Sequence, residues 1–211
     1  MTAKIIEIID EAQDIRSFKL QAKMEYLPGQ WFYVKLDENL KHHFTISSSP
    51  TEDFLQFTTK FREESDYKKA LWQKKVGDEL EINGPFGGFT LDEKDATPRL
   101  FIAGGIGITP FRSMIKYISD KQVTLPLALL YSVKNKNEGA FVKYLDELRI
   151  KNYELRTIET EKEGRLDKEK IEKHCPDWKE RTWWICGPPA MVEAAMMFAP
   201  TGARSEEFTG Y

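Results

Sequence analysis

The hydrophobic pattern of the chain changes near residue 96, and this change constrains the fold more than any other feature. Before it, six short segments rich in β-branched and aromatic residues are separated by turn or charged residues, which predicts a small antiparallel β-barrel. After it, strand-like segments alternate with helix-like ones, which predicts a parallel sheet with helices on both faces. We therefore expect two domains, a six-stranded antiparallel β-barrel over residues 1–96 and an α/β nucleotide-binding domain over residues 97–211.

Each expected element is located by its residues. The barrel strands are expected at residues 4–11, 17–22, 30–37, 43–49, 54–61 and 78–84, with Ser65 as the N-cap of a helix that extends to residue 75. In the second half, strands are expected at residues 99–105, 125–133, 153–160 and 181–187. Helices are expected at about residues 111–120, 141–151, 167–174 and 190–198. A cleft between two such domains is a favoured place for a ligand.

Charge and cysteine content exclude several classes of protein. The 31 basic and 34 acidic residues give a net charge of −3, whereas a nucleic-acid-binding protein is usually strongly basic. With only Cys175 and Cys186, we expect neither a disulfide scaffold nor an iron–sulfur cluster. His42 and His43 are adjacent, but His174 is the only other histidine, so we expect no metal site.

No segment resembles a membrane helix or a signal peptide. The uncharged stretch over residues 100–111 is too short to cross a bilayer. The first 14 residues contain acidic side chains where a signal peptide needs an apolar run. We therefore expect a cytoplasmic protein without a membrane span.

The strongest local signal is the segment Gly104-Gly105-Ile106-Gly107-Ile108-Thr109-Pro110, between an apolar strand and a helix. Glycines allow a phosphate to approach the backbone, and a helix N-terminus attracts the anion. Thr109 is suited to cap the helix, and Pro110 to occupy its first turn. The segment therefore favours a nucleotide pyrophosphate site, with a tight structural turn as the alternative.

The next strand bears on the choice of nicotinamide cofactor. No carboxylate follows the glycine segment at the distance that suits a ribose 2′-hydroxyl. Instead, Ser132 lies at the end of the strand and Lys134 and Lys136 follow it, and a hydroxyl with two ammonium groups suits a 2′-phosphate. We expect NADP or NAD, with a preference for NADP; a solvated basic loop is the alternative.

Two further segments suit a redox cofactor. Cys186-Gly187-Pro188-Pro189 ends a buried strand at the edge where parallel sheets hold ligands, although a buried cysteine is often only a small apolar residue. In the first half, residues 42–50 place hydroxyls beside an aromatic side chain, which suits a planar heterocycle.

These segments, in this order, resemble the ferredoxin–NADP reductase superfamily along essentially the whole chain. The resemblance implies a flavin-binding barrel followed by a nicotinamide-nucleotide domain. It also implies an oxidoreductase that transfers hydride from NAD(P)H to FAD and passes the electrons to a separate acceptor.

The resemblance assigns roles to individual residues. In the barrel, it implies that Phe44 packs against the flavin, that Thr45 hydrogen-bonds near its hydride-accepting nitrogen, and that the helix start at Ser65 binds its pyrophosphate. Residues 104–110 would bind the nicotinamide pyrophosphate, and Cys186, Gly187 and Pro188 would lie beside the nicotinamide ring. Glu206 or Glu207 resembles the family's catalytic acid; which of the two is left open. Phe208 would cover the flavin.

The family's pyrophosphate-binding arginine is replaced by His42, which is followed by His43. Histidine is mostly neutral at neutral pH, so we expect weaker flavin binding whose affinity changes between pH 5.5 and 8 and is higher at mildly acidic pH. Lys41 can partly replace the arginine only if its side chain reaches the same face of the strand as His42. Side chains alternate along a strand, so we expect Lys41 to point to the other face.

Three kinds of acceptor remain open. The first is a protein such as ferredoxin, flavodoxin or an oxygenase component, and a basic patch of Lys68, Lys69, Lys74 and Lys75 would favour it. The second is a small diffusible acceptor such as free flavin, a ferric chelate or a quinone. The third reading is a flavin-carrying subunit without independent turnover. We expect a stand-alone reductase core because the sequence contains no globin or cysteine-rich ferredoxin module; it does not indicate the oligomeric state.

Overall fold

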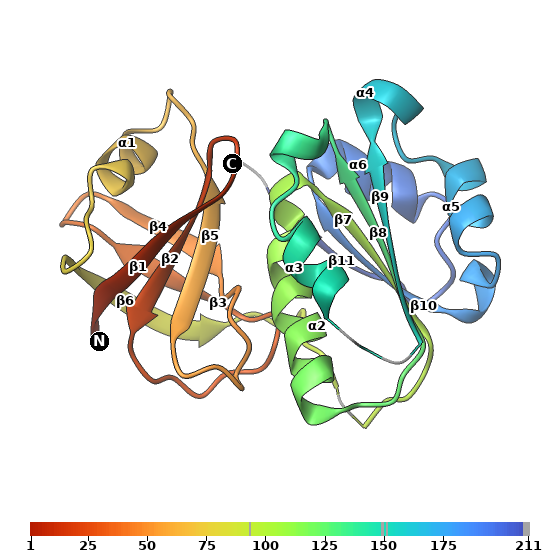
Figure 1. Ribbon diagram of the computed structural model, residues 1–211, viewed down its shortest axis with the longest axis horizontal. Coiled ribbons are helices and arrows are strands. Elements are labelled where there is room, and N and C mark those ends of the chain that lie inside the picture. Colours follow the sequence, from red (N-terminus) through yellow and green to blue (C-terminus); the bar gives the residue numbers. More distant parts are fainter. Residues whose placement is uncertain (93, 149, 151, 209–211) are drawn as a thin grey trace.

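The computed structural model describes residues 1–92, 94–148, 150 and 152–208, and it consists of two domains that lie side by side (Figure 1). In the part of the chain that it describes, no helix combines the length and apolar character needed to cross a membrane.

The first domain is a six-stranded antiparallel sheet in the order β4-β3-β6-β1-β2-β5. Its strands are β1 (Thr2–Ala12), β2 (Ile15–Gln21), β3 (Trp31–Lys35), β4 (Lys41–Thr45), β5 (Leu55–Lys60) and β6 (Glu79–Phe86). The outer strands β4 and β5 are connected, within the described residues, by the single bridge between Ile46 and Phe57. The predicted antiparallel domain is therefore confirmed, and its sheet curls into a barrel with a seam between β4 and β5.

One helix, α1 (Asp66–Trp72), packs Tyr67 and Leu71 into the barrel core. It begins where the sequence predicts, because the side chain of Ser65 accepts a hydrogen bond from the backbone N–H of Lys68 at 3.3 Å.

The second domain is a five-stranded parallel sheet in the order β11-β10-β7-β8-β9. Its strands are β7 (Arg99–Gly104), β8 (Leu127–Val133), β9 (Tyr153–Glu159), β10 (Thr182–Gly187) and β11 (Arg204–Glu207). Its helices are α2 (Ile108–Lys121), α3 (Val142–Glu147), α4 (Thr160–Glu163), α5 (Lys168–His174) and α6 (Pro189–Met196), with short 3-10 turns η1 (Gly105–Gly107), η2 (Lys136–Glu138) and η3 (Trp178–Glu180). Residues 149 and 151, near the C-terminal end of the helix expected over residues 141–151, lie outside the described residues.

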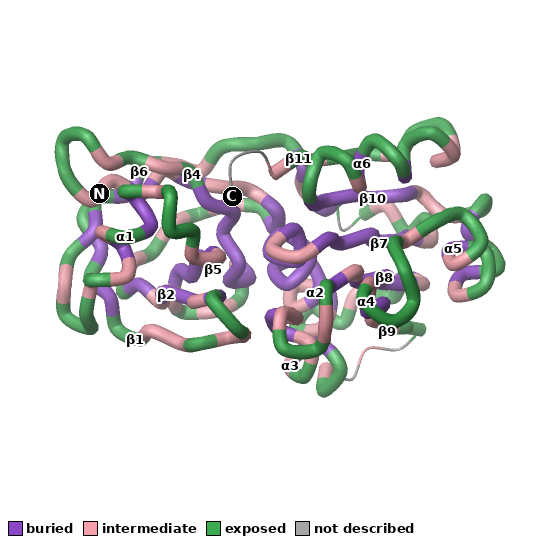
Figure 2. Tube along the Cα trace, turned by 90° about the horizontal axis from the view of Figure 1, so that it is seen from above, coloured by how far each residue is buried: buried purple, intermediate pink, exposed green. Residues whose placement is uncertain are grey.

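Helices cover both faces of this sheet, as predicted. Phe101 of β7 packs on one face with Phe111 of α2, whereas its neighbour Leu100 packs on the other with Val192 of α6. The central strands β7 and β10 are buried along most of their length (Figure 2). This burial explains why their sequences are continuous apolar runs.

Strand β11 was not predicted, because the sequence was interpreted there as a C-terminal tail. Its residues, Arg-Ser-Glu-Glu, have no apolar alternation. The strand forms because its backbone pairs in parallel with β10 at the edge of the sheet.

The two domains are joined by polar contacts of α2. The Arg112 guanidinium donates to the carbonyl of Ser47 at 3.0 Å and forms an ion pair with Glu52. The Ser113 hydroxyl donates to the carbonyl of Ser48 at 2.5 Å. These contacts explain why β4 ends at Thr45, four residues earlier than expected.

The domain boundary at residue 96 stays a prediction. Phe89 and Leu91 precede it, yet both pack into the core cluster of the second domain. The segment that follows β6 is therefore part of the contact between the domains.

Candidate functional site

The glycine segment connects β7 directly to α2. Gly104 ends β7, the turn η1 follows, and α2 begins at Ile108, earlier than predicted. The prediction that Thr109 caps this helix is wrong: Gly107 is the N-cap, and the Thr109 hydroxyl donates to the carbonyl of Ile106 at 3.1 Å. The reason is that η1 continues into the helix without an extended residue between them. Pro110 lies in the first turn, as predicted.

Two of these glycines are required by close packing between the ends of β7 and β10. A Cβ on Gly104 would lie 2.5 Å from Met191 Sδ, and a Cβ on Gly107 would lie 2.3 Å from the carbonyl oxygen of Cys186. Gly105 is different, because its φ is +52° and a Cβ there would meet nothing within 4 Å. The backbone at Gly105 is therefore open to a ligand.

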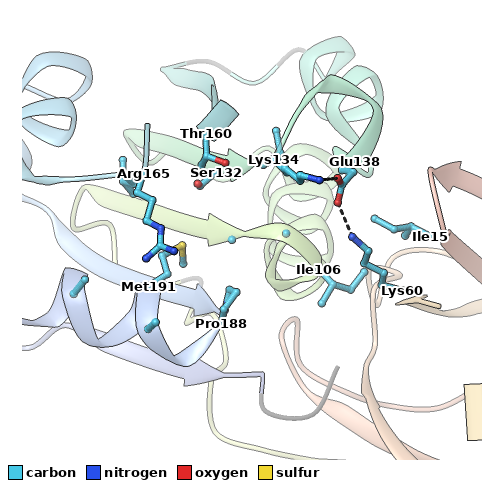
Figure 3. Close-up of a pocket in the computed structure, with 16 residues that line it drawn as sticks. Ile15, Lys60, Ile106, Ser132, Lys134, Glu138, Thr160, Arg165, Pro188 and Met191 are labelled. Atoms are coloured by element: carbon cyan, nitrogen blue, oxygen red, sulfur yellow. Dashed lines mark hydrogen bonds and ion pairs between the residues drawn. The ribbon is translucent and has the colours of Figure 1, made fainter. Parts of the chain in front are cut away.

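A cleft of about 400 Å³ lies at the carboxyl ends of β7 and β8 and at the start of α6 (Figure 3). It brings together several predicted binding residues, namely Gly104, Gly105, Ser132, Lys134 and Pro188. Ile15 and Lys60 of the barrel also line it, so the cleft lies between the domains. Such an edge of a parallel sheet is where nucleotides bind.

The basic residues that line the cleft differ in the ion pairs they form. Lys134 Nζ lies 3.9 Å from Glu138 and 3.6 Å from Glu161, and Lys60 Nζ lies 2.6 Å from Glu138. Arg165 points into the cleft (Figure 3), and no ion pair with another described residue is found for it. Arg165 is not among the residues that the sequence predicts for this site. It follows Gly164, the residue that ends the short helix α4 after β9, and the only sequence signal is this position beyond a strand whose carboxyl end reaches the same edge of the sheet.

Cys186 and Glu206 form a second group, and neither lines the cleft. They are partners in the parallel register of β10 and β11, and Cys186 is fully buried. Burial, and then the charge of Glu206, raise the pKa of the Cys186 thiol. Burial raises the pKa of Glu206 to about 7, and its Oε2 has no hydrogen-bond partner among the described residues. Glu207 is exposed. Of the two acids that the sequence left open, the geometry favours Glu206.

Ile106 and Phe208 lie at the junction of the domains, since each packs against the barrel core and against the core of the second domain. The backbone N–H of Phe208 donates to the carbonyl of Gly187 at 3.0 Å. Residues 209–211, which complete the predicted tail, lie outside the described residues.

Strand β4 contains the four residues that are expected to bind the flavin, namely His42, His43, Phe44 and Thr45. Phe44 and Thr45 are buried, and the Phe44 ring stacks on Phe57 with 4.8 Å between centroids. His42 stacks on Phe44 at 5.1 Å, whereas His43 is exposed. The predicted contact between Phe44 and a flavin ring therefore stays a prediction, because barrel side chains surround the Phe44 ring here.

One prediction for this region stays a prediction, and another is wrong. Burial, and secondarily the charge of Lys68, lower the pKa of His42 to about 4. The imidazole is therefore neutral at pH 7 in the ligand-free protein, and the expected change of flavin affinity between pH 5.5 and 8 stays a prediction. Lys68 is only 1% exposed and cannot join Lys69, Lys74 and Lys75 in a surface patch. The helix turns its side chain into the barrel seam instead.

Other hydroxyls of the predicted flavin segment are used inside the protein. Ser47 bonds to Thr58 at 2.9 Å, and Ser48 bonds to Tyr26 at 2.9 Å. Thr45 is thus the hydroxyl of this segment best placed for a ligand.

The described residues contain no group of three or more histidine, cysteine or acidic side chains suited to hold a metal.

Comparison with known families matches both domains. Residues 2–91 match the oxidoreductase FAD-binding domain, and residues 101–196 match the oxidoreductase NAD-binding domain. Flavohemoprotein A of Dictyostelium discoideum is 28% identical over 210 residues, which cover 88% of this chain and 53% of that protein. The glycine betaine monooxygenase reductase subunit of Chromohalobacter salexigens is 28% identical over 213 residues, covering 90% and 58%. The chain thus spans little more than half the length of these relatives.

Solved structures share the fold. The FAD/NAD-binding domain of nitric oxide dioxygenase from Vibrio cholerae has a TM-score of 0.85 at 18% identity, covering 98% of both chains. A ferredoxin NADP+ reductase from Neisseria gonorrhoeae, solved with FAD and NADP, has a TM-score of 0.82 at 16% identity, covering 93% of this chain and 89% of that one. With both domains matched and in this order, the chain belongs to the oxidoreductases built from an FAD-binding domain followed by an NAD-binding domain, and it has the fold of the ferredoxin–NADP reductases.

Proposed function

We propose that the chain takes hydride from NADPH or NADH onto FAD bound at the barrel and passes the electrons to a separate protein acceptor. The observation that carries this proposal is the position of Ile106 and Phe208. Ile106 belongs to the glycine turn that lines the nucleotide cleft, and Phe208 follows β11; both contact the barrel core that contains Phe44. A nucleotide in the cleft and a flavin at β4 would meet at this junction, as hydride transfer requires.

The residues at the barrel seam fit a flavin dinucleotide. Lys68 offers a buried ammonium group for the diphosphate, and Thr45 a hydroxyl for a ring nitrogen. When bound, FAD supplies the chemistry that couples a two-electron donor to a one-electron acceptor. The protein supplies position and exclusion of water.

On the nicotinamide side, each residue has a proposed role. The open backbone at Gly105 and the start of α2 bind the pyrophosphate. Cys186 packs beside the reacting ring, and Glu206 holds a proton near it, because a carboxyl with a pKa of about 7 is largely protonated below that pH. Phe208 fills the junction and must move when the nicotinamide stacks there.

We propose NADP rather than NAD as the preferred nucleotide. Ser132, Lys134 and Arg165 line one side of the cleft, and a guanidinium can bind a 2′-phosphate through two parallel hydrogen bonds. The R165M variant should weaken NADPH binding by about 10- to 100-fold and change NADH binding less than twofold. K168M, a nearby exposed lysine outside the cleft, is the control. An equal loss for both nucleotides would contradict the assignment.

The acceptor is proposed to be a protein. Several relatives carry names such as glycine betaine monooxygenase reductase subunit and propane 2-monooxygenase reductase component, which describe partners of oxygenases. Turnover with free flavin, ferric chelates or quinones alone would instead favour a diffusible acceptor.

We also propose a reducing compartment, and hence a cytoplasmic location. Cys175 and Cys186 are both free thiols, and both are buried. Two unpaired cysteines are typical of proteins that work where disulfides are kept reduced.

The experiment that tests the function is an anaerobic titration of the FAD-loaded protein with NADPH and with NADH, following the absorption of oxidised flavin. Stoichiometric bleaching by one nucleotide is expected. Flavin that binds but does not bleach would overturn the reductase proposal and favour a flavin-carrying subunit.

A further inference from the structure

A buried lysine lies at the seam of the barrel. Among the buried charged side chains of the described residues, Arg99, Arg112 and Glu159 belong to the second domain, and Lys68 is the one in the barrel. Burial of an ammonium group is unfavourable, so a lysine in such a place is often functional.

Among the described residues, elements α1, β4 and β5 meet at the Lys68 ammonium group. It extends from α1, donates a hydrogen bond to Thr59 Oγ1 of β5, and lies 4.4 Å from the ring centroid of Phe44 of β4. The His42 imidazole stacks on the same Phe44 ring. The ammonium group therefore lies between the two outer strands of the sheet, which the bridge from Ile46 to Phe57 joins.

The other nearby lysines point elsewhere. The Lys41 ammonium group lies 4.0 Å from the ring centroid of Tyr33, whose strand position is on the outer face with exposed His43. The exposed Lys69 lies 4.0 Å from Asp66 of its own helix. Neither is shown to reach the seam.

The diphosphate of FAD is an anion that a protein binds best through a charged donor. Burial lowers the pKa of His42 to about 4, so in the ligand-free protein at pH 7 its imidazole offers the diphosphate no positive charge. We propose that Lys68 is the cationic group that binds the FAD diphosphate in this protein. This inference rests on the proposed function, because it requires that FAD binds at the barrel.

The test separates the diphosphate from the flavin ring. FAD and riboflavin, which has the same ring system but no phosphate, are titrated by calorimetry into the apoprotein of wild type, K68M and K68R. We expect K68M to weaken FAD binding about 10- to 100-fold and to change riboflavin binding less than twofold. K68R keeps the charge and should remain within about threefold of wild type for FAD.

The matched control is K69M, the next residue on α1, which is exposed and should bind FAD as wild type does. Near-UV circular dichroism checks that each apoprotein is folded; if K68M is not, K68Q replaces it in the same comparison. Equal FAD affinity in K68M and wild type, or an equal loss for FAD and riboflavin, would overturn the role of Lys68. Absence of FAD binding by wild type would instead overturn the proposed function.

Discussion

Cys186 and Glu206 are register partners in the parallel pair of β10 and β11, so their side chains lie side by side on the same face of the sheet. The thiol is fully buried, and the carboxyl is sufficiently withdrawn from water that its pKa rises to about 7. A carboxyl in this state can give up or hold a proton near neutral pH, whereas the Glu207 side chain is exposed to water. The pairing of β10 with β11 therefore places two acids that are adjacent in the sequence in different environments, with Glu206 partly buried and Glu207 exposed.

The first prediction concerns the rate of hydride transfer. E206Q should slow the bleaching of bound flavin by NADPH about 10- to 100-fold, because the amide cannot exchange a proton at the same site. E207Q should stay within about twofold of wild type. Stopped-flow absorption measures both, and FAD affinity should be unchanged in each. Equal rates for E206Q and wild type would remove Glu206 from the mechanism.

The second prediction concerns stability and pH. The pKa of Glu206 is about 7 in the folded protein and near 4.5 in the unfolded chain, so the folded state binds more protons between these values. The free energy of unfolding therefore falls as the pH rises from 4.5 to 7. E206Q lacks this titration and should be about 2–3 kcal/mol more stable than wild type above pH 7, with no gain below pH 4.5. Urea unfolding at several pH values measures the difference; a gain that is the same at all pH values would contradict the cause.

The third prediction concerns the glycine turn. A methyl group on Gly104 would collide with Met191 and Pro188, whereas Gly88 has open space around its Cβ position. G104A should lower the free energy of unfolding by about 1–3 kcal/mol and weaken NADPH binding, and G88A should change stability by less than about 0.5 kcal/mol. Thermal or urea unfolding compares the two variants. If G104A were as stable as wild type, Met191 and Pro188 would have to move aside at little cost, and the close packing would not require a glycine at residue 104.

Strong local patterns explain what could be predicted from the sequence. The apolar runs of β7 and β10 and the glycine turn that follows β7 indicate a parallel nucleotide-binding sheet, because few other structures combine buried strands with such a turn. The cap at Ser65 was predictable for the same reason, since it depends on one side chain and the next turn of backbone.

What could not be predicted depends on contacts between distant residues. β11 exists because its backbone pairs with β10, and the residues Arg204–Glu207 give no sign of it. The position of Lys68 depends on which side of α1 meets the seam between β4 and β5, so four lysines close in sequence look alike until the helix is docked. Arg165 enters the cleft only because the chain turns back after α4.

The last prediction concerns the pH dependence of FAD binding, which we attribute to the protonation of Lys68. Burial, and then the positive charge of Arg62, lower the pKa of Lys68 to about 7. In the ligand-free protein, burial lowers the pKa of His42 to about 4, lowers that of His43 and raises that of Tyr67, so these three described neighbours do not change charge from neutral pH upward.

The charged form of Lys68 binds the FAD diphosphate, and this form prevails below pH 7 in the ligand-free protein. A bound anion raises the lysine pKa, so FAD affinity should be constant below about pH 6 and fall above pH 7, by at most about tenfold per pH unit. Riboflavin affinity should stay constant, and K68R should bind FAD equally from pH 5.5 to 8.5 because arginine remains charged. Calorimetric titrations across this range provide the measurement. A flat FAD profile in wild type would mean that Lys68 does not change its charge near the flavin, whereas a slope retained in K68R would assign the titration to another group.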